Sequence, residues 1–299
     1  MSTARPQIAL IGYGEVGRIL AADLHTAGIR DIVIWDRLLP VPTSIPARAA
    51  AASKAQIATS MAEAVTGRTL IISAVTAVNC VPAAREAVSA IAPQAIYFDL
   101  NSVAPQTKRA AASAVEAAGG RYVEAAVMSP IAPKRIGSQM LLGGPHAAAF
   151  EPLAREIGFT GIRVFDPTVG PASAAKMCRS VMIKGLEALL AESLLAARRY
   201  GVERTVLASL RDLFPNEGWE RLAAYMISRS LEHGLRRAEE MREAAHAVAD
   251  AGVDPVMSVA CATRQEWAAG HRPAETLASL AELLDAVLAL SGGELMESA

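Results

Sequence analysis

Short, almost wholly apolar runs recur along the first 165 residues of the chain. They occupy residues 7–11, 31–35, 69–75, 95–100, 121–127, 139–144 and 161–165, with a weaker candidate at 56–58. Such runs are typical of strands that are covered on both faces of a parallel sheet. Amphipathic segments separate them, and one of these opens at Pro105 and closes at Gly119 and Gly120. The alternation of strand and helix predicts a doubly wound α/β sheet.

The pattern changes after residue 168, where the strand-like runs stop. A helical pattern without proline after Pro171 fills about 170–200. Further helical segments follow at 203–214, 216–231, 235–251, 256–269 and 274–290. We therefore expect an α/β domain at 1–168 and an all-helical domain at 169–299, which begins with a long interdomain helix.

The first apolar run leads into the stretch "IGYGEVG", in which Gly12, Gly14 and Gly17 fit the spacing G-x-G-x-x-G. In a dinucleotide-binding turn the first glycine makes the bend, the second admits the pyrophosphate and the third lets helix pack on strand. A glycine-rich structural turn is the alternative, but a strand precedes the motif and a helical pattern follows it. The sequence thus predicts a Rossmann-type cofactor site that also includes the intervening residues Tyr13, Glu15 and Val16.

Asp36 ends the second apolar run, 19 residues beyond Gly17. A carboxylate at this point accepts hydrogen bonds from the adenosine ribose and repels a 2′-phosphate, which favours NAD. NADP remains an alternative, because Arg37 could pair with such a phosphate or else stack on adenine. Val75 and Thr76 follow another strand at its carboxyl end and are expected to border the nicotinamide ribose.

Lys176 lies in the first turns of the long helix. At about 100° per residue, Ser180, Lys184 and Glu187 share its face of the helix. A solvated face is the alternative for such a group. Small residues before Lys176 would let the helix start approach a ligand, however, and the helix begins where an interdomain cleft is expected.

Four motifs give the chain a resemblance to the β-hydroxyacid dehydrogenase superfamily, which includes 3-hydroxyisobutyrate, tartronate semialdehyde and 6-phosphogluconate dehydrogenases. They are "IGYGEVG", "FDLNSVAP" (98–105), "VEAAVMSPIAP" (123–133) and "GPASAAK" (170–176). The helical half resembles a phosphogluconate-dehydrogenase-like C-terminal domain. The resemblance implies a nicotinamide cofactor, Lys176 as the catalytic lysine, and a homodimer formed through the helical domain.

Three departures from the family pattern concern the substrate. Met128, Ser129 and Pro130 stand where Ser-Gly-Gly is usual, and Ser180 replaces an asparagine. Ile183 occupies the position at which the 6-phosphogluconate enzymes carry a glutamate. Oxidation followed by decarboxylation is therefore disfavoured, although the sequence leaves it open.

The resemblance and the motifs together predict an NAD(P)-dependent enzyme that transfers a hydride between nicotinamide and a β-hydroxy acid or a related hydroxy or carbonyl compound. Lys176 would act as general acid and base. The residues expected to hold the substrate are Asn101, Ser102, Ser129, Ser180 and one of Arg236 and Arg237. A solvated helix laced with ion pairs is the alternative for the two arginines.

Two other functions remain open on the same fold. One is a non-catalytic NAD-binding sensor or scaffold. The other is an imine-reductase-like reductase, against which Lys176 argues, since such enzymes generally carry Asp or Tyr at this position.

Composition narrows the partners and the compartment. The 299 residues carry 29 basic and 30 acidic side chains, a net charge of −1 that provides no field for nucleic acid or an anionic membrane. The three cysteines are far apart and the histidines lack metal-ligand spacing, so neither a disulfide framework nor a metal site is expected. Cys80 and Cys178 are expected to be small buried residues. No apolar stretch reaches the roughly 20 residues of a membrane span, and we expect a cytoplasmic protein with a small-molecule substrate.

Overall fold

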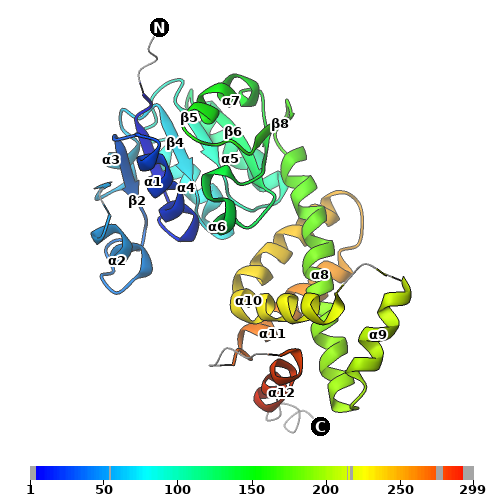
Figure 1. Cartoon of the computed structure of the whole chain (residues 1–299). Coiled ribbons are helices and arrows are strands. Elements are labelled where there is room, and N and C mark those ends of the chain that lie inside the picture. Colours follow the sequence, from blue (N-terminus) through cyan, green and yellow to red (C-terminus); the bar gives the residue numbers. More distant parts are fainter. Residues whose placement is uncertain (1–4, 54, 214, 216–217, 274–278, 292–299) are drawn as a thin grey trace. The chain divides into compact units, whose positions relative to one another are not determined.

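A computed structural model describes residues 5–53, 55–213, 215, 218–273 and 279–291. The chain divides into two compact units, Met1–Met177 and Cys178–Ala299, and the boundary between them falls inside the long helix α8 (Pro171–Arg199). Figure 1 shows the sheet of the first unit and the helices of the second. Among the described residues, no helix combines the length and the apolar character that a membrane span requires.

The first unit is built on an eight-stranded sheet with the strand order β3-β2-β1-β4-β5-β6-β7-β8. The strands are β1 (Ile8–Ile11), β2 (Ile32–Trp35), β3 (Gln56–Ile57), β4 (Leu70–Ser73), β5 (Ile96–Asp99), β6 (Arg121–Val127), β7 (Met140–Gly143) and β8 (Ile162–Asp166). The first six strands have the order of a dinucleotide-binding sheet, whose direction of winding reverses between β1 and β4. The predicted Rossmann-type fold class is confirmed.

One strand departs from the parallel arrangement. β7 runs antiparallel to β6, with Val127 opposite Met140, whereas β7 and β8 are again parallel. The connection before β7 contains only α6 (Ile131–Lys134) and a 3-10 turn at Arg135–Gly137. These two pieces are too short to form the crossover helix that a parallel return requires.

Helices cover both faces of this sheet. Ile8 and Leu10 of β1 point to the face covered by α1 (Glu15–Thr26) and α7 (Ala147–Glu156), whereas Ala9 and Ile11 point to the opposite face. That second face is covered by α3 (Met61–Val65), α4 (Cys80–Ala87) and α5 (Pro105–Ala117). α2 (Ile45–Ala51) follows β2. β1 is fully buried because side chains on both of its faces are covered, which explains its unbroken apolar sequence.

The second unit consists of helices. Beyond its part of α8 it contains α9 (Glu203–Leu213), α10 (Trp219–Asp250), α11 (Val256–Ala269) and α12 (Leu280–Ser291). Its core combines leucines of α8 and α12 with Trp219, Ile227 and Leu231 of α10.

The prediction of two helices at 216–231 and 235–251 is confirmed, because α10 consists of two helical segments joined at a kink within Trp219–Asp250. The kink lies at His233, whose backbone is not helical (φ −122°, ψ 15°). Gly234 is required there by close packing, since a Cβ atom at this position would lie 2.4 Å from the carbonyl oxygen of Gln265 on α11. Residues 214, 216–217 and 274–278 of the predicted helices lie outside the described residues.

Candidate active site

A groove of about 580 Å³ opens in the first unit where β1, β2 and β4 end. Seven of the residues predicted to bind the cofactor line it: Gly12, Gly14, Glu15, Asp36, Arg37, Val75 and Thr76. The other three, Tyr13, Val16 and Gly17, are not part of this lining. Tyr13 is buried in the core, Val16 packs against that core, and Gly17 is buried in α1. The groove lies where the sheet reverses its winding, which is the general location of cofactors in open α/β sheets.

The three glycines of the turn differ in what surrounds them. Gly12 has φ +91°, and a Cβ atom there would lie 2.4 Å from the carbonyl oxygen of Ala74. A Cβ atom on Gly17 would lie 2.0 Å from the carbonyl oxygen of Gly12. Gly14, at the N-cap of α1, has no neighbour within 4 Å of its Cβ position. The turn thus keeps its middle glycine open, which fits the approach of a pyrophosphate to the backbone.

Asp36 is held at the end of β2 by two backbone N–H groups. Its Oδ2 accepts a hydrogen bond from the N–H of Tyr13 at 2.8 Å, and its Oδ1 accepts one from the N–H of Leu38 at 2.8 Å. Each carboxylate oxygen retains a further acceptor position. Asp36 can therefore accept hydrogen bonds from ribose hydroxyls without losing its own anchors.

Arg37 reaches a residue that the sequence did not single out. Its Nη1 donates to Oδ1 of Asn79 at 3.0 Å, and Nδ2 of Asn79 donates to Oγ1 of Thr76 at 2.7 Å. Asn79 ends a 3-10 turn between β4 and α4 and lines the groove. An asparagine between two apolar segments carries no motif, and only the assembled sheet brings it opposite Arg37.

Asn101 connects the groove to the loop after β5. Its Oδ1 accepts a hydrogen bond from the N–H of Val75 at 2.7 Å, and its Nδ2 donates to Oγ of Ser73 at 3.0 Å. The side chain is only 3% exposed. These contacts support a role for Asn101 in holding two loops together rather than in touching substrate.

Lys176 and Ser102 are brought together, although 74 residues separate them. The Lys176 ammonium group donates a hydrogen bond to the Ser102 hydroxyl in a part-buried setting. Ser102 directly follows Asn101, so a continuous set of contacts runs from Val75 in the groove to Lys176. Of the predicted substrate residues, the structure joins Asn101 and Ser102 to this set.

A cluster of buried polar side chains lies beneath this loop. The Lys108 ammonium group is 2.9 Å from Oδ1 of Asp99, and the Tyr122 hydroxyl donates to Oδ2 of Asp99 at 2.5 Å. Oδ1 of Asp99 also accepts the backbone N–H of Asn101 at 2.8 Å. Burial, together with the charge of Asp99, raises the pKa of Tyr122 and that of the nearby Cys80 thiol. Cys80 is therefore a neutral thiol and not an activated nucleophile.

The remaining cysteine and serine predictions have different outcomes. Cys80 is buried as expected, but the prediction for Cys178 was wrong, since it is exposed on α8. Ser129 follows the carboxyl end of β6, and its buried hydroxyl has no hydrogen-bond partner among the described residues. Such a group is one that a ligand or a water molecule would satisfy.

In the second unit, Ser180 accepts a hydrogen bond from Nζ of Lys184 at 3.1 Å. The same Lys184 nitrogen lies 2.9 Å from Oε2 of Glu240, on α10. Ser180 is thus buried within a charged network between α8 and α10.

The two arginines of α10 have different surroundings. Nη1 of Arg237 lies 2.7 Å from Oε2 of the buried Glu187, whereas Arg236 is 52% exposed and pairs with Glu240 on its own helix. Burial raises the pKa of Glu187, and the charge of Arg237 opposes that rise. Arg237 is committed to a buried ion pair, which leaves Arg236 as the more available of the two cations.

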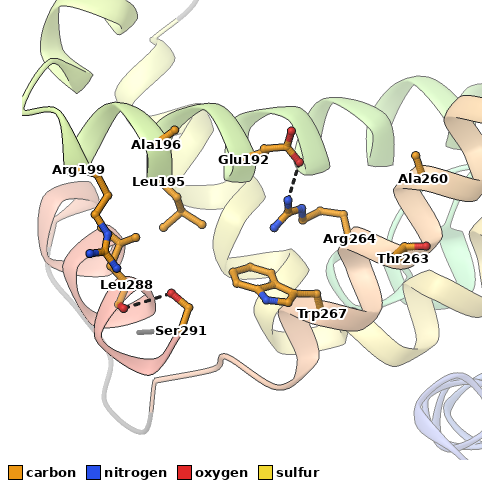
Figure 2. Close-up of a pocket in the computed structure, with 10 residues that line it drawn as sticks. All are labelled: Glu192, Leu195, Ala196, Arg199, Ala260, Thr263, Arg264, Trp267, Leu288 and Ser291. Atoms are coloured by element: carbon orange, nitrogen blue, oxygen red, sulfur yellow. Dashed lines mark hydrogen bonds and ion pairs between the residues drawn. The ribbon is translucent and has the colours of Figure 1, made fainter. Parts of the chain in front are cut away.

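A larger groove, of about 770 Å³, belongs to the second unit and includes none of the predicted site residues. Figure 2 shows that it is walled by α8, α11 and α12. Arg199 and Arg264 both line it, and Nη2 of Arg264 is 2.5 Å from Oε2 of Glu192 while its guanidinium group lies over the Trp267 ring. Within the described residues no cluster of three His, Cys, Asp or Glu side chains could hold a metal ion.

Comparisons with known proteins agree with this geometry. The family model of the NAD binding domain of 6-phosphogluconate dehydrogenase matches residues 7–188, and a domain of unknown function matches residues 197–268. The chain is 31% identical to a conserved hypothetical protein from Sinorhizobium meliloti 1021, covering 96% of this chain and 97% of that one, with a TM-score of 0.75.

Two further relatives are more distant. The 3-hydroxyisobutyrate dehydrogenase of Pseudomonas aeruginosa is 25% identical over 219 residues, which are 71% of each chain. An imine reductase of Streptomyces aurantiacus shares the fold, at 21% identity and a TM-score of 0.53, covering 95% of this chain and 98% of that one.

The sheet, the open glycine turn and the groove beside it define an oxidoreductase that uses NAD(P). Within that class, the chain belongs to the β-hydroxyacid dehydrogenase superfamily.

Proposed function

We propose that the protein is a dehydrogenase that transfers a hydride between NAD and a β-hydroxy acid or a related hydroxy or carbonyl compound. The observation that carries this proposal is the hydrogen bond from Lys176 to Ser102, at the end of the contacts that begin in the groove at Val75. The nicotinamide ring, when bound, supplies the hydride acceptor or donor. The residues of this chain have to supply the proton transfer and the orientation of the substrate.

Lys176 is the proposed general acid and base. In the reductive direction its ammonium group gives a proton to the carbonyl oxygen, and in the oxidative direction its neutral amine takes the hydroxyl proton. Ser102 accepts a hydrogen bond from Lys176 and so fixes the direction in which the remaining N–H bonds point. The fixed direction matters because proton transfer requires hydrogen-bond reach to the substrate oxygen.

Ser102 and Ser129 are the proposed substrate contacts of the first unit. Ser129 offers a hydroxyl without a protein partner among the described residues. Asn101 is proposed to hold the neighbouring Ser102 in place through its hydrogen bonds with Val75 and Ser73. Ser180 and Arg236 are the proposed contacts from the second unit, where Arg236 would hold the substrate carboxylate.

The imine reductase that shares the fold makes reduction of a C=N bond the second candidate. Lys176 favours the dehydrogenase, because its ammonium group is suited to protonating an alkoxide oxygen. A non-catalytic NAD-binding protein is the third candidate, and turnover distinguishes it from both enzymes.

We also propose a cytoplasmic homodimer with domain limits 1–168 and 169–299. Exposed apolar side chains on the second unit support its role as the dimer surface, among them Met182 and Leu189 of α8 and Met257 and Val259 of α11. Light scattering on the purified protein would give the mass directly.

A screen of NAD reduction over three- to six-carbon and aryl-substituted β-hydroxy acids tests the proposed reaction. Formation of NADH with at least one of them, and none with cyclic amines, supports the dehydrogenase. Oxidation of amines alone would favour the imine reductase. NADH binding without turnover of either class would favour the sensor.

A further inference from the structure

Glu124 is a buried carboxylate in the middle of β6 that has no part in the contacts described so far. One of its oxygens, Oε2, accepts the backbone N–H of Gly170 at 2.7 Å. The other, Oε1, accepts the backbone N–H of Ser173 at 2.6 Å and also the Ser173 hydroxyl. A fully buried carboxylate requires such partners, because an unsatisfied buried charge is costly.

The partners of Glu124 belong to the start of α8. Gly170 immediately precedes the helix and Ser173 is its third residue. The first N–H groups of a helix have no partner within the helix, and a negative charge near them is favourable. A strand residue thus supplies the cap that α8 lacks in its own sequence.

Two glycines lie close to this carboxylate and to the start of α8. A Cβ atom on Gly143 of β7 would lie 2.6 Å from Oε2 of Glu124. Gly170 has φ +126°, and a Cβ atom there would lie 2.7 Å from Nη1 of Arg109. Gly143 thus admits the Glu124 carboxylate beside β7, and the positive φ of Gly170 sets the direction in which the chain enters α8.

Lys176 lies three residues after Ser173 and thus on the same face of α8, one turn further along. We propose that Glu124 is a positioning residue. By capping the N-terminus of α8 it fixes where the helix starts along its axis and how it is rotated about that axis, and so places Lys176 within hydrogen-bond reach of Ser102. The consequence for catalysis rests on the proposed role of Lys176. The positional claim itself does not.

The test measures the Lys176 amine without using turnover. Trace acetylation with acetic anhydride, followed by peptide mass spectrometry, gives the labelling of Lys176 relative to the exposed Lys134. The variants are Glu124→Gln, whose amide can accept at only one side of the cap, and Ser173→Ala, which removes a single hydroxyl. Asp166→Asn is the matched control, because the hydrogen bonds that the described residues make to the Asp166 carboxylate come from the N–H and the hydroxyl of Thr168, which precedes α8.

We expect Glu124→Gln to raise the Lys176 labelling ratio by roughly threefold or more, the scale on which a lost buried hydrogen bond shifts a local equilibrium. Ser173→Ala should raise the same ratio by a smaller factor. If Glu124→Gln does not fold, the result for Ser173→Ala tests the proposal in its place. Asp166→Asn should leave the ratio unchanged. In active protein, Glu124→Gln should lower kcat with little change in NADH affinity.

An unchanged ratio in a folded Glu124→Gln or Ser173→Ala variant would overturn the proposal, as would an equal rise in Asp166→Asn. Failure of the proposed function has a different signature. In that case Lys176→Ala retains turnover, while the labelling ratios still report whether Glu124 positions the lysine.

Discussion

The ammonium group of Lys108 lies 2.9 Å from a carboxylate oxygen of Asp99, and neither side chain has any exposed surface. The same nitrogen donates to the backbone carbonyl of Asp99 at 2.9 Å. Asp99 in turn accepts the N–H of Asn101, so this ion pair underlies the loop that carries Ser102.

Replacement of Lys108 by Met should lower the free energy of unfolding by about 3–5 kcal/mol, because it leaves the buried Asp99 charge uncompensated. Denaturant titration measures this cost. The double variant Asp99→Asn, Lys108→Met should lose less than the single variant, since no unpaired charge remains. A single variant within about 1 kcal/mol of wild type, the range of exposed pairs, would show that the pair is unimportant.

Asp36→Ala should weaken NADH binding. It should also lower the ratio of the NADPH to the NADH dissociation constant by roughly tenfold, the equivalent of about 1.4 kcal/mol. The ribose acceptor and the repulsion of a 2′-phosphate are lost together. Fluorescence titration of both reduced cofactors gives the two dissociation constants. Glu86→Ala, which removes another carboxylate from the lining of the groove, should not change their ratio. Equal wild-type affinity for the two cofactors would contradict the proposed role of Asp36.

Lys176→Ala should lower turnover by roughly 10²–10⁴, the scale of general acid–base catalysis, and leave NADH binding nearly intact. Steady-state rates and a fluorescence titration on the same preparation separate the two effects. Lys134→Ala removes an exposed lysine and serves as the control. Turnover of Lys176→Ala within a few-fold of wild type would exclude the lysine as the proton-transfer group.

The two arginines of α10 should respond differently to replacement by Ala. Arg237→Ala should cost about 3 kcal/mol of stability, because it leaves Glu187 buried without its partner. Arg236→Ala should cost at most about 0.5 kcal/mol, as for other exposed helix pairs, yet raise the KM of a carboxylate substrate with no change in that of NAD. If neither variant alters the substrate KM, these arginines do not hold the carboxylate.

The buried tyrosines predict the response to alkali. Burial and the nearby Asp99 charge raise the pKa of Tyr97 and Tyr122 well above the usual 10.0. The unfolded chain therefore loses these protons first, so their contribution to stability is complete below pH 10 and decreases as the pH rises further. Tyrosinate absorbance should show both groups ionising only when the protein unfolds, with Tyr122→Phe removing one of them from the unfolding step. Ionisation of Tyr97 and Tyr122 in the folded protein would contradict their burial.

The features of the fold that were predicted correctly have short-range causes. The apolar run at β1 and the glycines after it produce a buried strand and a turn through local sterics, so both can be predicted from the sequence. The direction of β7 is not, because "QMLLGG" would fit a strand of either direction and only the short α6 connection decides. The break in the helical pattern before residue 235 correctly predicted the kink of α10 at His233. The contact with α11 that requires Gly234 could not be predicted, because it depends on how the two helices pack.

The candidate site divides in the same way. Gly12, Asp36 and Lys176 belong to motifs whose spacing carries a physical meaning, and the predictions concerning them follow from that spacing. Asn79 and Glu124 act through partners 42 and 49 residues away, respectively. Such partners are known only after the sheet has set the distances between its strands.

The unequal surroundings of the three turn glycines have a consequence for how related sequences diverge. A side chain at position 12 or 17 collides with backbone, so those glycines remain under selection for folding even in a lineage that has abandoned the cofactor. Position 14 is open and has φ −75°, which any residue adopts, so only the ligand restrains it. Drift at position 14 beside unchanged glycines at 12 and 17 would therefore mark descendants that kept the architecture after ceasing to bind the dinucleotide.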